Sequence, residues 1–296
     1  MKNRLFSPPN LAVLALLGSA TMWGVIWYPL RLLEAQGLAG VWCALLMYGA
    51  ALCVALPWVW RCRYELLARP WALLALGMVS GWANLAFILA VIDGLVVRVT
   101  LLFFLYPLWA ILLGRFVLKE HMSVMAWLGF SVALGGALIM LWDAGLGNPL
   151  PRSLTDWLAL SSGLTFAVAA VIVRGLETSS VVTKTMAVWA GNVAVAALWA
   201  VLTAVDPPLA GVSAYLGAVL LGIFGTVVMT LLVQYGIHHV PLYRSSVILL
   251  FELIAGAASA YWLAHEVPGL GEWLGGVLIV AGAWLILSRR ARAEAA

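Results

Sequence analysis

The chain has 296 residues, of which 65% are hydrophobic and 9% are charged, and its mean hydropathy is +1.07. Soluble globular domains carry about 25% charged residues, so this composition excludes a water-soluble domain and indicates a lipid bilayer as the surroundings. The net charge of +4 does not indicate a nucleic-acid partner, because the basic residues are scattered through short loops beside apolar segments.

Apolar stretches of near-membrane length follow one another along the whole chain. In the first half they cover residues 11–30, 41–60, 71–91, 96–114 and 125–142. In the second half they cover residues 157–173, 185–205, 214–237, 246–263 and 273–287. A membrane-spanning helix needs about 20 apolar residues, whereas a barrel strand needs about ten that alternate in polarity. The sequence therefore predicts an all-α membrane protein with ten transmembrane helices.

Lysine and arginine are distributed unevenly between the two sides of these helices. One set of alternate loops, together with both termini, holds thirteen of them, and the other set holds only three, Arg31, Arg98 and Arg152. Positive residues accumulate on the cytoplasmic side of membrane proteins, so the richer set is predicted to be cytoplasmic. Both termini then lie in the cytoplasm, which requires an even number of crossings.

The two halves of the chain resemble each other when the sequence is shifted by 146 positions. The shift places Trp127-Leu128-Gly129 on Trp273-Leu274-Gly275, Gly136-Ala137 on Gly282-Ala283, Glu120 on Glu266 and Arg98 on Arg244. Each half has five crossings, so the second half enters the membrane from the opposite side. We therefore predict two inverted five-helix repeats, residues 1–146 and 147–296, around a central cavity. Such repeats are typical of secondary transporters, and the alternative interpretation is a duplication that serves folding alone.

Enzyme chemistry is not predicted from the sequence. A rhomboid-type protease needs a buried Ser and His pair, yet all four histidines lie at segment ends or in loops, and no Gly-x-Ser-x-Gly motif occurs. No Walker loop or dinucleotide-binding fingerprint occurs, so transport would draw on a gradient instead of ATP. The three cysteines give neither a disulfide framework nor a zinc-ligand spacing. We therefore expect no catalytic residues, no cofactor and no metal site.

The order and spacing of several residues resemble the ten-helix EamA branch of the drug/metabolite transporter superfamily. These residues are Trp23-Gly24, Arg98, Pro107, Glu120 and Gly129 in the first half, and Arg244, Glu252, Glu266, Gly275 and Gly282 in the second. Two positions depart from the family pattern. Leu253 stands where a proline often follows Glu252, and residues 46–48 lack the usual arginine of the second helix.

Within that superfamily the chain resembles bacterial inner-membrane exporters of amino acids, including aromatic ones, and of some cationic drugs. The resemblance implies a multi-pass protein of the bacterial inner membrane, with a cavity lined mainly by helices one, three, four, six, eight and nine. It also implies a small-molecule substrate, amino acids first of all. A monomer is expected to suffice, with a dimer as the alternative.

Glu252 is the ionisable residue that lies in the middle of a predicted segment. A charged side chain at the bilayer centre costs about 2.5 kcal/mol or more, so Glu252 is expected to face the bundle interior or a water-filled cavity. There it is interpreted as a contact for a substrate amine or as a protonatable coupling group. The alternative is a carboxyl group that holds the ninth helix by hydrogen bonds to hydroxyls such as Ser246 or Ser259.

The other candidate site residues are polar or aromatic and lie on helices that the family places around the cavity. They are Asn84, Thr230, Gln234 and Tyr235, together with Trp23, Trp27, Trp82, Tyr106 and Phe166. We expect them to form an apolar pocket wall with a few polar contacts. Taken singly, each has the alternative of bonding a neighbouring helix, packing in the core or facing lipid.

Helix kinks supply two further candidates. Pro107 and Gly114 in helix four are predicted gating positions, because kinked half-helices can act as gates in transporters. For Gly222 and Gly225 in helix eight, close packing is the preferred interpretation.

The leading hypothesis is a secondary transporter that exports amino acids and related small amphipathic metabolites across the inner membrane by alternating access. A second hypothesis is an exporter of lipophilic or quaternary cations, for which Glu252 would supply the negative charge. A third is a membrane scaffold or integral enzyme without transport. Clustered catalytic groups or an extended soluble appendage would favour the third hypothesis, and the sequence contains neither.

Overall fold

The computed structural model describes residues 8–117, 124–142, 151–239 and 248–293. Within these ranges all regular structure is helical. Seven spans are long and apolar enough to cross a membrane, and three shorter apolar helices, residues 127–141, 251–264 and 270–282, complete the described set. The predicted all-α membrane fold is therefore confirmed. Of the residues named above, Glu120, Arg244 and Ser246 lie outside the described ranges.

Several membrane spans consist of more than one helical piece. The first half contains α1 (Pro8–Val25), α2 (Trp27–Ala35), α3 (Gly40–Ala68), α4 (Pro70–Asp93), α5 (Val96–Phe103), α6 (Tyr106–Phe116) and α7 (Val124–Leu141). The second half contains α8 (Leu154–Gly175), α9 (Val181–Leu202), α10 (Val212–Leu220), η2 (Leu221–Val227), α11 (Val228–His239), α13 (Phe251–Ala264) and α14 (Leu270–Ala293). α1 with α2, α5 with α6, and α10 with η2 and α11 each form one span.

The helices begin where the local sequence can cap them. Ser153 and Ser180 precede α8 and α9, and their hydroxyls accept the backbone N–H groups of Asp156 and Thr183. Pro70 opens α4, a position that requires no N–H donor. Lipid offers the backbone no hydrogen-bond partner, so continuous apolar stretches of this length form helices.

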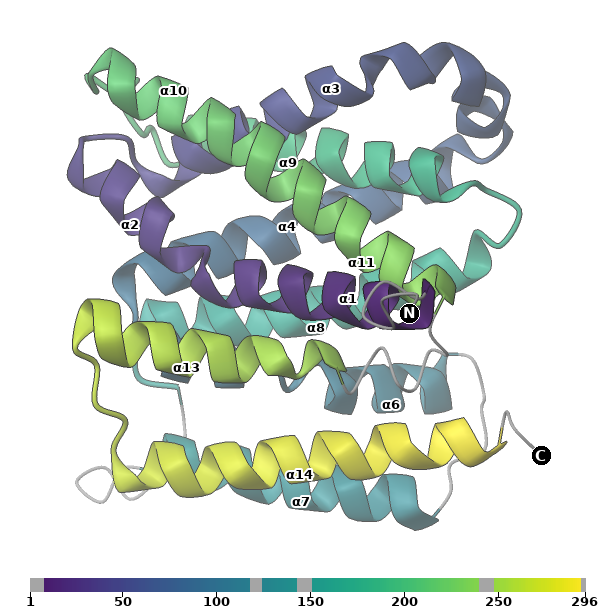
Figure 1. Cartoon of the computed structure of the whole chain (residues 1–296), viewed down its shortest axis with the longest axis vertical. Coiled ribbons are helices and arrows are strands. Elements are labelled where there is room, and N and C mark those ends of the chain that lie inside the picture. The colour runs from purple at the N-terminus through teal and green to yellow at the C-terminus, as the bar shows by residue number, and fades with distance from the viewer. Residues whose placement is uncertain (1–7, 118–123, 143–150, 240–247, 294–296) are drawn as a thin grey trace, which may run out of the picture.

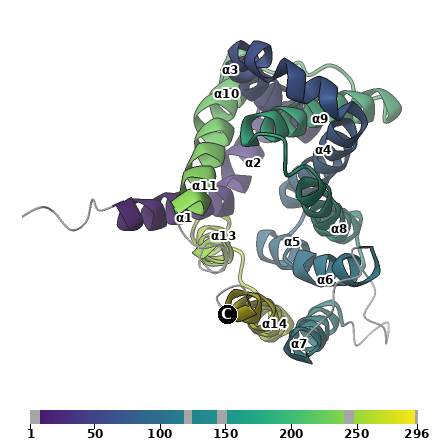
Figure 2. The same ribbon diagram turned by 90° about the vertical axis from the view of Figure 1, so that its right-hand side faces the viewer.

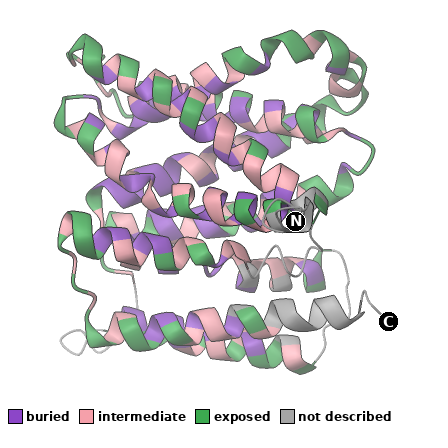
Figure 3. Ribbon diagram, viewed as in Figure 1, coloured by how far each residue is buried: buried purple, intermediate pink, exposed green. Residues whose placement is uncertain are grey.

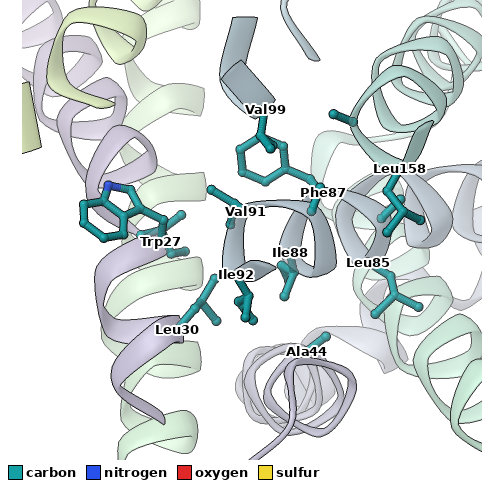
Figure 4. Close-up of a cluster of buried hydrophobic side chains, with 14 of the residues drawn as sticks. Trp27, Leu30, Ala44, Leu85, Phe87, Ile88, Val91, Ile92, Val99 and Leu158 are labelled. Atoms are coloured by element: carbon teal, nitrogen blue, oxygen red, sulfur yellow. The ribbon is translucent and has the colours of Figure 1, made fainter. Parts of the chain in front are cut away.

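The helices lie side by side and run across the view, roughly at right angles to the longest axis of the molecule (Figure 1). Viewed along the helices, α1, α11, α3, α9, α4, α8 and α5 surround an interior, and α7 with α14 form a pair at one end (Figure 2). Buried residues concentrate where the helices face one another, whereas the outward faces are exposed (Figure 3). Leu30, Leu85, Ile88 and Val91 belong to the main buried cluster (Figure 4).

The crossing of α7 and α14 has the two-fold symmetry expected of an inverted repeat. Gly129 and Gly136 of α7 correspond to Gly275 and Gly282 of α14 under the shift of 146 positions. A Cβ on Gly136 would lie 2.6 Å from the Gly275 carbonyl oxygen, and one on Gly282 would lie 2.5 Å from that of Gly129. Exchanging the halves converts one contact into the other. A pseudo-two-fold axis therefore passes between two helices that are in backbone contact.

Two helix breaks also occupy equivalent positions of the repeat. The fourth span is interrupted at Phe104 and Leu105, directly before Pro107 in the first turn of α6. The ninth span turns at Leu250, the equivalent of Phe104, before α13 begins. Pro107 lacks an N–H donor and so favours the first break. Its equivalent is Leu253, so the second break forms without a proline.

The first and eighth spans are irregular as well. α1 ends at Val25 and α2 begins at Trp27, so the first span is broken in its middle. η2 is a π-helical segment of the eighth span, and its Gly222 packs against the Met47 carbonyl of α3. This contact supports close packing as the role of Gly222. α6 runs through Gly114 without interruption.

Candidate functional site

The paired breaks place Tyr106 and Glu252 in the first turns of α6 and α13. The shift of 146 positions relates these two residues, so they are equivalents in the two repeats. Tyr106 lies in the middle of its span, and the Glu252 carboxylate is close enough to act electrostatically on the Tyr106 hydroxyl. The two residues therefore lie in the first turns of equivalent helices of the two repeats, directly after the paired breaks.

The Glu252 side chain is half-buried. It makes no hydrogen bond or ion pair with any residue that the structure describes. Three side-chain atoms in those ranges are fully buried without a hydrogen-bond partner, namely Trp109 Nε1, Asn192 Oδ1 and Thr226 Oγ1. The Glu252 oxygens are not among them. Ser259 does not hold it, because Ser259 Oγ accepts from Trp27 Nε1 at 2.9 Å and donates to the Gly256 carbonyl at 3.0 Å. Among the described residues, Glu252 therefore has no hydrogen-bond partner for its carboxylate.

Gly24 allows α1 to cross α13 at the level of Glu252. A Cβ on Gly24 would lie 2.7 Å from the Glu252 carbonyl oxygen and 2.8 Å from the Gly256 backbone nitrogen. A larger residue would push the two helices apart, so glycine is required at this crossing. Trp23, which precedes Gly24 and is half-buried, is thereby placed on α1 beside the same region.

Aromatic rings form a wall next to Tyr106. The Phe166 ring of α8 lies 5.1 Å from the Tyr106 ring and 5.4 Å from the Phe103 ring, both edge-to-face. α8 comes this close because Gly163, one turn before Phe166, contacts the Phe103 carbonyl oxygen, which would be 2.6 Å from a Cβ on Gly163. Phe166 is nevertheless 43% exposed, so the wall borders open space. Such a wall suits an apolar or aromatic ligand.

Asn84 of α4 and Thr230 of α11 form a second pair of equivalent residues. Each bonds its own helix, because Asn84 Nδ2 donates to the Ser80 carbonyl at 2.9 Å and Thr230 Oγ1 donates to the Thr226 carbonyl at 2.7 Å. Ser80 and Thr226 are equivalents too, so both halves contain the same local arrangement. The Asn84 amide oxygen accepts no bond from a described residue and is not sealed, so it remains available.

Trp27 and Trp82 are each held by an indole hydrogen bond. Trp27 donates to Ser259 of α13 and is only 2% exposed, so it belongs to the core and not to an open wall. Trp82 is half-buried, its Nε1 donates to Ser161 Oγ at 3.2 Å, and its ring lies 5.1 Å from that of Trp199. Trp82 therefore lies where α4 faces α8 and α9. Sequence reasoning did not select Ser161 or Trp199 as its partners.

Gln234 and Tyr235 lie toward the end of the bundle where α1 begins. Gln234 Nε2 donates to Thr185 Oγ1 of α9 at 3.0 Å, and the Tyr235 ring lies 4.3 Å from the His239 ring. Tyr235 also packs against the buried cluster of Ala12 and Leu16 in the first turns of α1. The structure does not bring these two residues to Tyr106 and Glu252.

Asn192 of α9 is a buried polar residue that sequence reasoning missed. Its side chain is 1% exposed, and Nδ2 donates to the Val188 carbonyl at 2.8 Å. Its Oδ1 is sealed without a partner among the described residues. The sequence could have indicated Asn192, because Asn84 was chosen for the same feature, an amide side chain in the middle of an apolar segment.

Two ion pairs at one end of the bundle were also missed. Arg31 pairs with Glu266 at 3.0 Å, and Arg98 pairs with Asp156 at 2.8 Å. The sequence interpretation treated both arginines only as indicators of orientation. In the part of the chain that the structure describes, no group of three or more His, Cys, Asp or Glu side chains could hold a metal ion.

A groove of about 1070 Å³ lies between α13 and α14, with α5 as its floor. Its lining is almost entirely apolar and includes Phe251, Ile254, Tyr261 and Trp284, with Glu272 as the charged member. These α13 residues lie on the helix face opposite Glu252, and none of the predicted cavity residues lines the groove. The groove is therefore separate from the Tyr106 and Glu252 site.

Comparison with known proteins agrees with this architecture. The EamA-like transporter family matches residues 10–142 and residues 153–288. A solved structure described only as "Crystal structure of protein" shares the fold, with a TM-score of 0.56 and 19% sequence identity over 95% of this chain and 98% of that chain. No curated protein matches. Because the family matches span most of both halves, the chain belongs to the EamA-like transporter family.

Proposed function

We propose that this membrane transporter exports amino acids and related small amphipathic metabolites by alternating access. The observation that carries the proposal is that Tyr106 and Glu252 follow the paired helix breaks at equivalent positions of the two repeats, and the Glu252 carboxylate has no hydrogen-bond partner among the described residues. In inverted-repeat transporters the substrate lies between the repeats near the midplane, commonly where helices are broken. The position of Tyr106 and Glu252 directly after the paired breaks supports such a site.

The chemistry around Glu252 suits a zwitterion. The Glu252 carboxylate would bind the substrate ammonium group, and charge-assisted hydrogen bonds of this kind are the strong ones. The α6 and α13 N-termini carry partial positive charge and begin at equivalent positions of the two repeats, so they would favour the substrate carboxylate. Tyr106 and Phe166 would contact an apolar or aromatic side chain. Asn84 and Thr230 would add polar contacts.

A second candidate is the export of lipophilic or quaternary cations. The observation that favours it is the aromatic wall of Phe103, Tyr106 and Phe166 beside a carboxylate. Cations bind the faces of aromatic rings, and an anionic group adds to that attraction. Membership of a transporter family favours both transport hypotheses over a membrane scaffold or an enzyme.

We further propose that the protein lies in the bacterial inner membrane with both termini in the cytoplasm and that one chain suffices for transport. The distribution of thirteen against three basic residues supports this orientation. Under it, the end of the bundle that holds Arg31 and Arg98 is the outer end. The predicted repeats, residues 1–146 and 147–296, then provide the two halves that move relative to each other.

Counterflow in proteoliposomes tests cargo and coupling together. Vesicles preloaded with unlabelled Trp, Phe, Thr or Met, or with a quaternary ammonium cation, receive the labelled compound outside, with and without a pH gradient. Amino-acid transport predicts accumulation of at least one labelled amino acid. Accumulation of the cation alone would favour the second candidate, and accumulation of nothing would contradict both.

Glu252→Gln separates the two candidates at the level of the site. A cation would lose its anionic contact, so its transport should be abolished. A zwitterion would keep the contacts of its carboxylate and side chain, so its transport should persist with a higher KM. Glu272→Gln is the matched control. Glu272 lines the groove between α13 and α14, so this substitution should affect the transport of neither cargo.

A further inference from the structure

Arg31, near the end of α2, binds the last carbonyls of α4. Its Nε donates to the Val91 and Ile92 carbonyls, both at 3.1 Å, and its Nη2 donates to the Gly94 carbonyl at 2.5 Å. Its Nη1 pairs with Glu266 Oε1 at 3.0 Å. One guanidinium group therefore uses its fork of donors on the end of α4 and on a carboxylate from the other half of the chain.

Glu266 completes the contact on the next helix. Its Oε2 accepts the Val96 N–H, at the start of α5, at 2.8 Å. Its own backbone N–H donates to the Ala260 carbonyl, so Glu266 is held against the end of α13. Arg31 and Glu266, named here the outer clamp, thus hold the turn between α4 and α5, residues 91–96, from both sides.

The charges of the outer clamp match the helix ends that they touch. The C-terminus of α4 presents carbonyls with partial negative charge to Arg31, and the N-terminus of α5 presents an N–H with partial positive charge to Glu266. The Arg31 and Glu266 side chains are only 26% and 11% exposed, so water competes weakly for these bonds.

The outer clamp adds polar bonds where α2 already packs on α4 and α13 already packs on α5. α1 crosses α13 at Gly24, which places Arg31 and Glu266 on one side of this contact. α5 packs on α8 where Gly163 meets the Phe103 carbonyl, which places the turn of residues 91–96 on the other side. The break at Ile26 separates α2 from α1 and gives the Arg31 segment a place to bend.

We propose that the outer clamp is the outer gate of the transport pathway. This gate proposal rests on the proposed function, because only a protein that opens alternately to two sides needs a gate. With Arg31 and Glu266 holding residues 91–96, the structure is closed at this end. Outward opening requires that α2 and the end of α13 release the turn between α4 and α5, which gives the Tyr106 and Glu252 site access to the outside.

Thr100→Cys reports on this opening. Thr100 lies one turn inward of Val96 on α5, is 5% exposed, and its Oγ1 would be 4.0 Å from a Cβ on Gly256 of α13. It therefore lies between α5 and α13, one turn from the outer clamp, where it also borders the groove between α13 and α14. The reporter is made in a chain whose three native cysteines are replaced by serine. Its reaction with a membrane-impermeant maleimide, added outside intact cells or right-side-out vesicles, is followed with time.

Arg31→Gln and Glu266→Gln should each speed the labelling of Thr100→Cys by about ten- to hundredfold, because each removes charge-assisted bonds from the closed state. The double variant should exceed the larger single effect only slightly, since both residues act in one contact. Asp156→Asn is the matched control. It weakens the other outer ion pair, but Arg98 and Asp156 join α5 to α8, which stay packed together, so labelling should remain at the parent rate.

Three results would overturn the proposal. They are a Thr100→Cys that stays protected in both clamp variants, equal labelling in Asp156→Asn, and labelling that occurs only from the cytoplasmic side. Melting temperatures of the purified variants show that any exposure comes from folded protein. The assay needs no substrate, so labelling as expected without amino-acid counterflow would leave the gate in place and contradict only the proposed cargo.

Discussion

Replacing Gly136 by alanine tests the crossing of α7 and α14. The added Cβ would lie 2.6 Å from the Gly275 carbonyl oxygen and 2.8 Å from Leu278 Cβ, whereas ordinary contacts begin at 3.4 Å. A backbone carbonyl cannot rotate away, so the helices must separate by about 0.8 Å at this point. Overpacking of this kind costs about 1–3 kcal/mol.

Gly135→Ala is the matched control, because a Cβ on Gly135 meets nothing within 4 Å. Both substitutions gain the same intrinsic helix propensity, which cancels in the comparison. We therefore expect the free energy of unfolding to be lower for Gly136→Ala than for Gly135→Ala by about 1–3 kcal/mol. The measurement is reversible unfolding in mixed micelles, followed by circular dichroism. Equal stability of the two variants would refute the reasoning.

The equivalent position in the second half extends the same test. Gly282→Ala places a Cβ 2.5 Å from the Gly129 carbonyl oxygen, so it should lower stability by about as much as Gly136→Ala. In the double variant one separation of α7 from α14 relieves both clashes, so the combined loss should be smaller than the sum. A strictly additive loss would indicate that the two contacts do not share one crossing.

Two further predictions concern the site itself. Glu252→Gln should raise the KM for a transported amino acid by about ten- to hundredfold, the equivalent of one charge-assisted hydrogen bond, while Glu272→Gln leaves it unchanged in the same counterflow assay. An unchanged KM in both would place the ammonium group elsewhere. Gly163→Ala should push α8 away from the Phe103 carbonyl and lower the free energy of unfolding by about 1–3 kcal/mol. Gly175→Ala, whose Cβ would meet nothing within 4 Å, should be neutral, and the reverse order would contradict the contact.

The membrane spans could be predicted because apolar blocks of about 20 residues have one stable form in lipid. The irregularities inside the spans could be predicted only where a residue forces them. Pro107 indicated the break in the fourth span, since it lacks an N–H donor. Pro29, in the first turn of α2, likewise favours the break at Ile26, although the sequence interpretation did not use it. Nothing local to Leu250 requires a break, and the π-helical segment η2 depends on how Gly222 packs against α3. These features are set by neighbouring helices.

The candidate site, too, could be predicted from the sequence only in part. Glu252 could be selected from the sequence because a carboxyl group in the middle of a membrane span is costly and therefore indicates a functional site. Its proximity to Tyr106 depends on the inverted packing of the two halves, which no single segment encodes. Arg31 was interpreted as an indicator of orientation, because sequence does not show which carbonyls a guanidinium reaches. Trp27 and Trp82 are both tryptophans inside apolar segments of the sequence. Trp27 is buried in the core and Trp82 is half-buried, and only the packing of the helices distinguishes them.

The repeat is symmetric where backbones touch and asymmetric where a ligand would bind. At the α7 and α14 crossing, glycine matches glycine, because both contacts demand the same close approach. At the paired breaks, by contrast, a phenol in one half corresponds to a carboxylate in the other. Two identical half-sites would bind either end of a ligand equally well, whereas Tyr106 and Glu252 offer different chemistry to its two ends. A zwitterion also has two different ends, so this asymmetry gives it one preferred orientation. The almost entirely apolar groove between α13 and α14 does not distinguish the two ends of a zwitterion in this way.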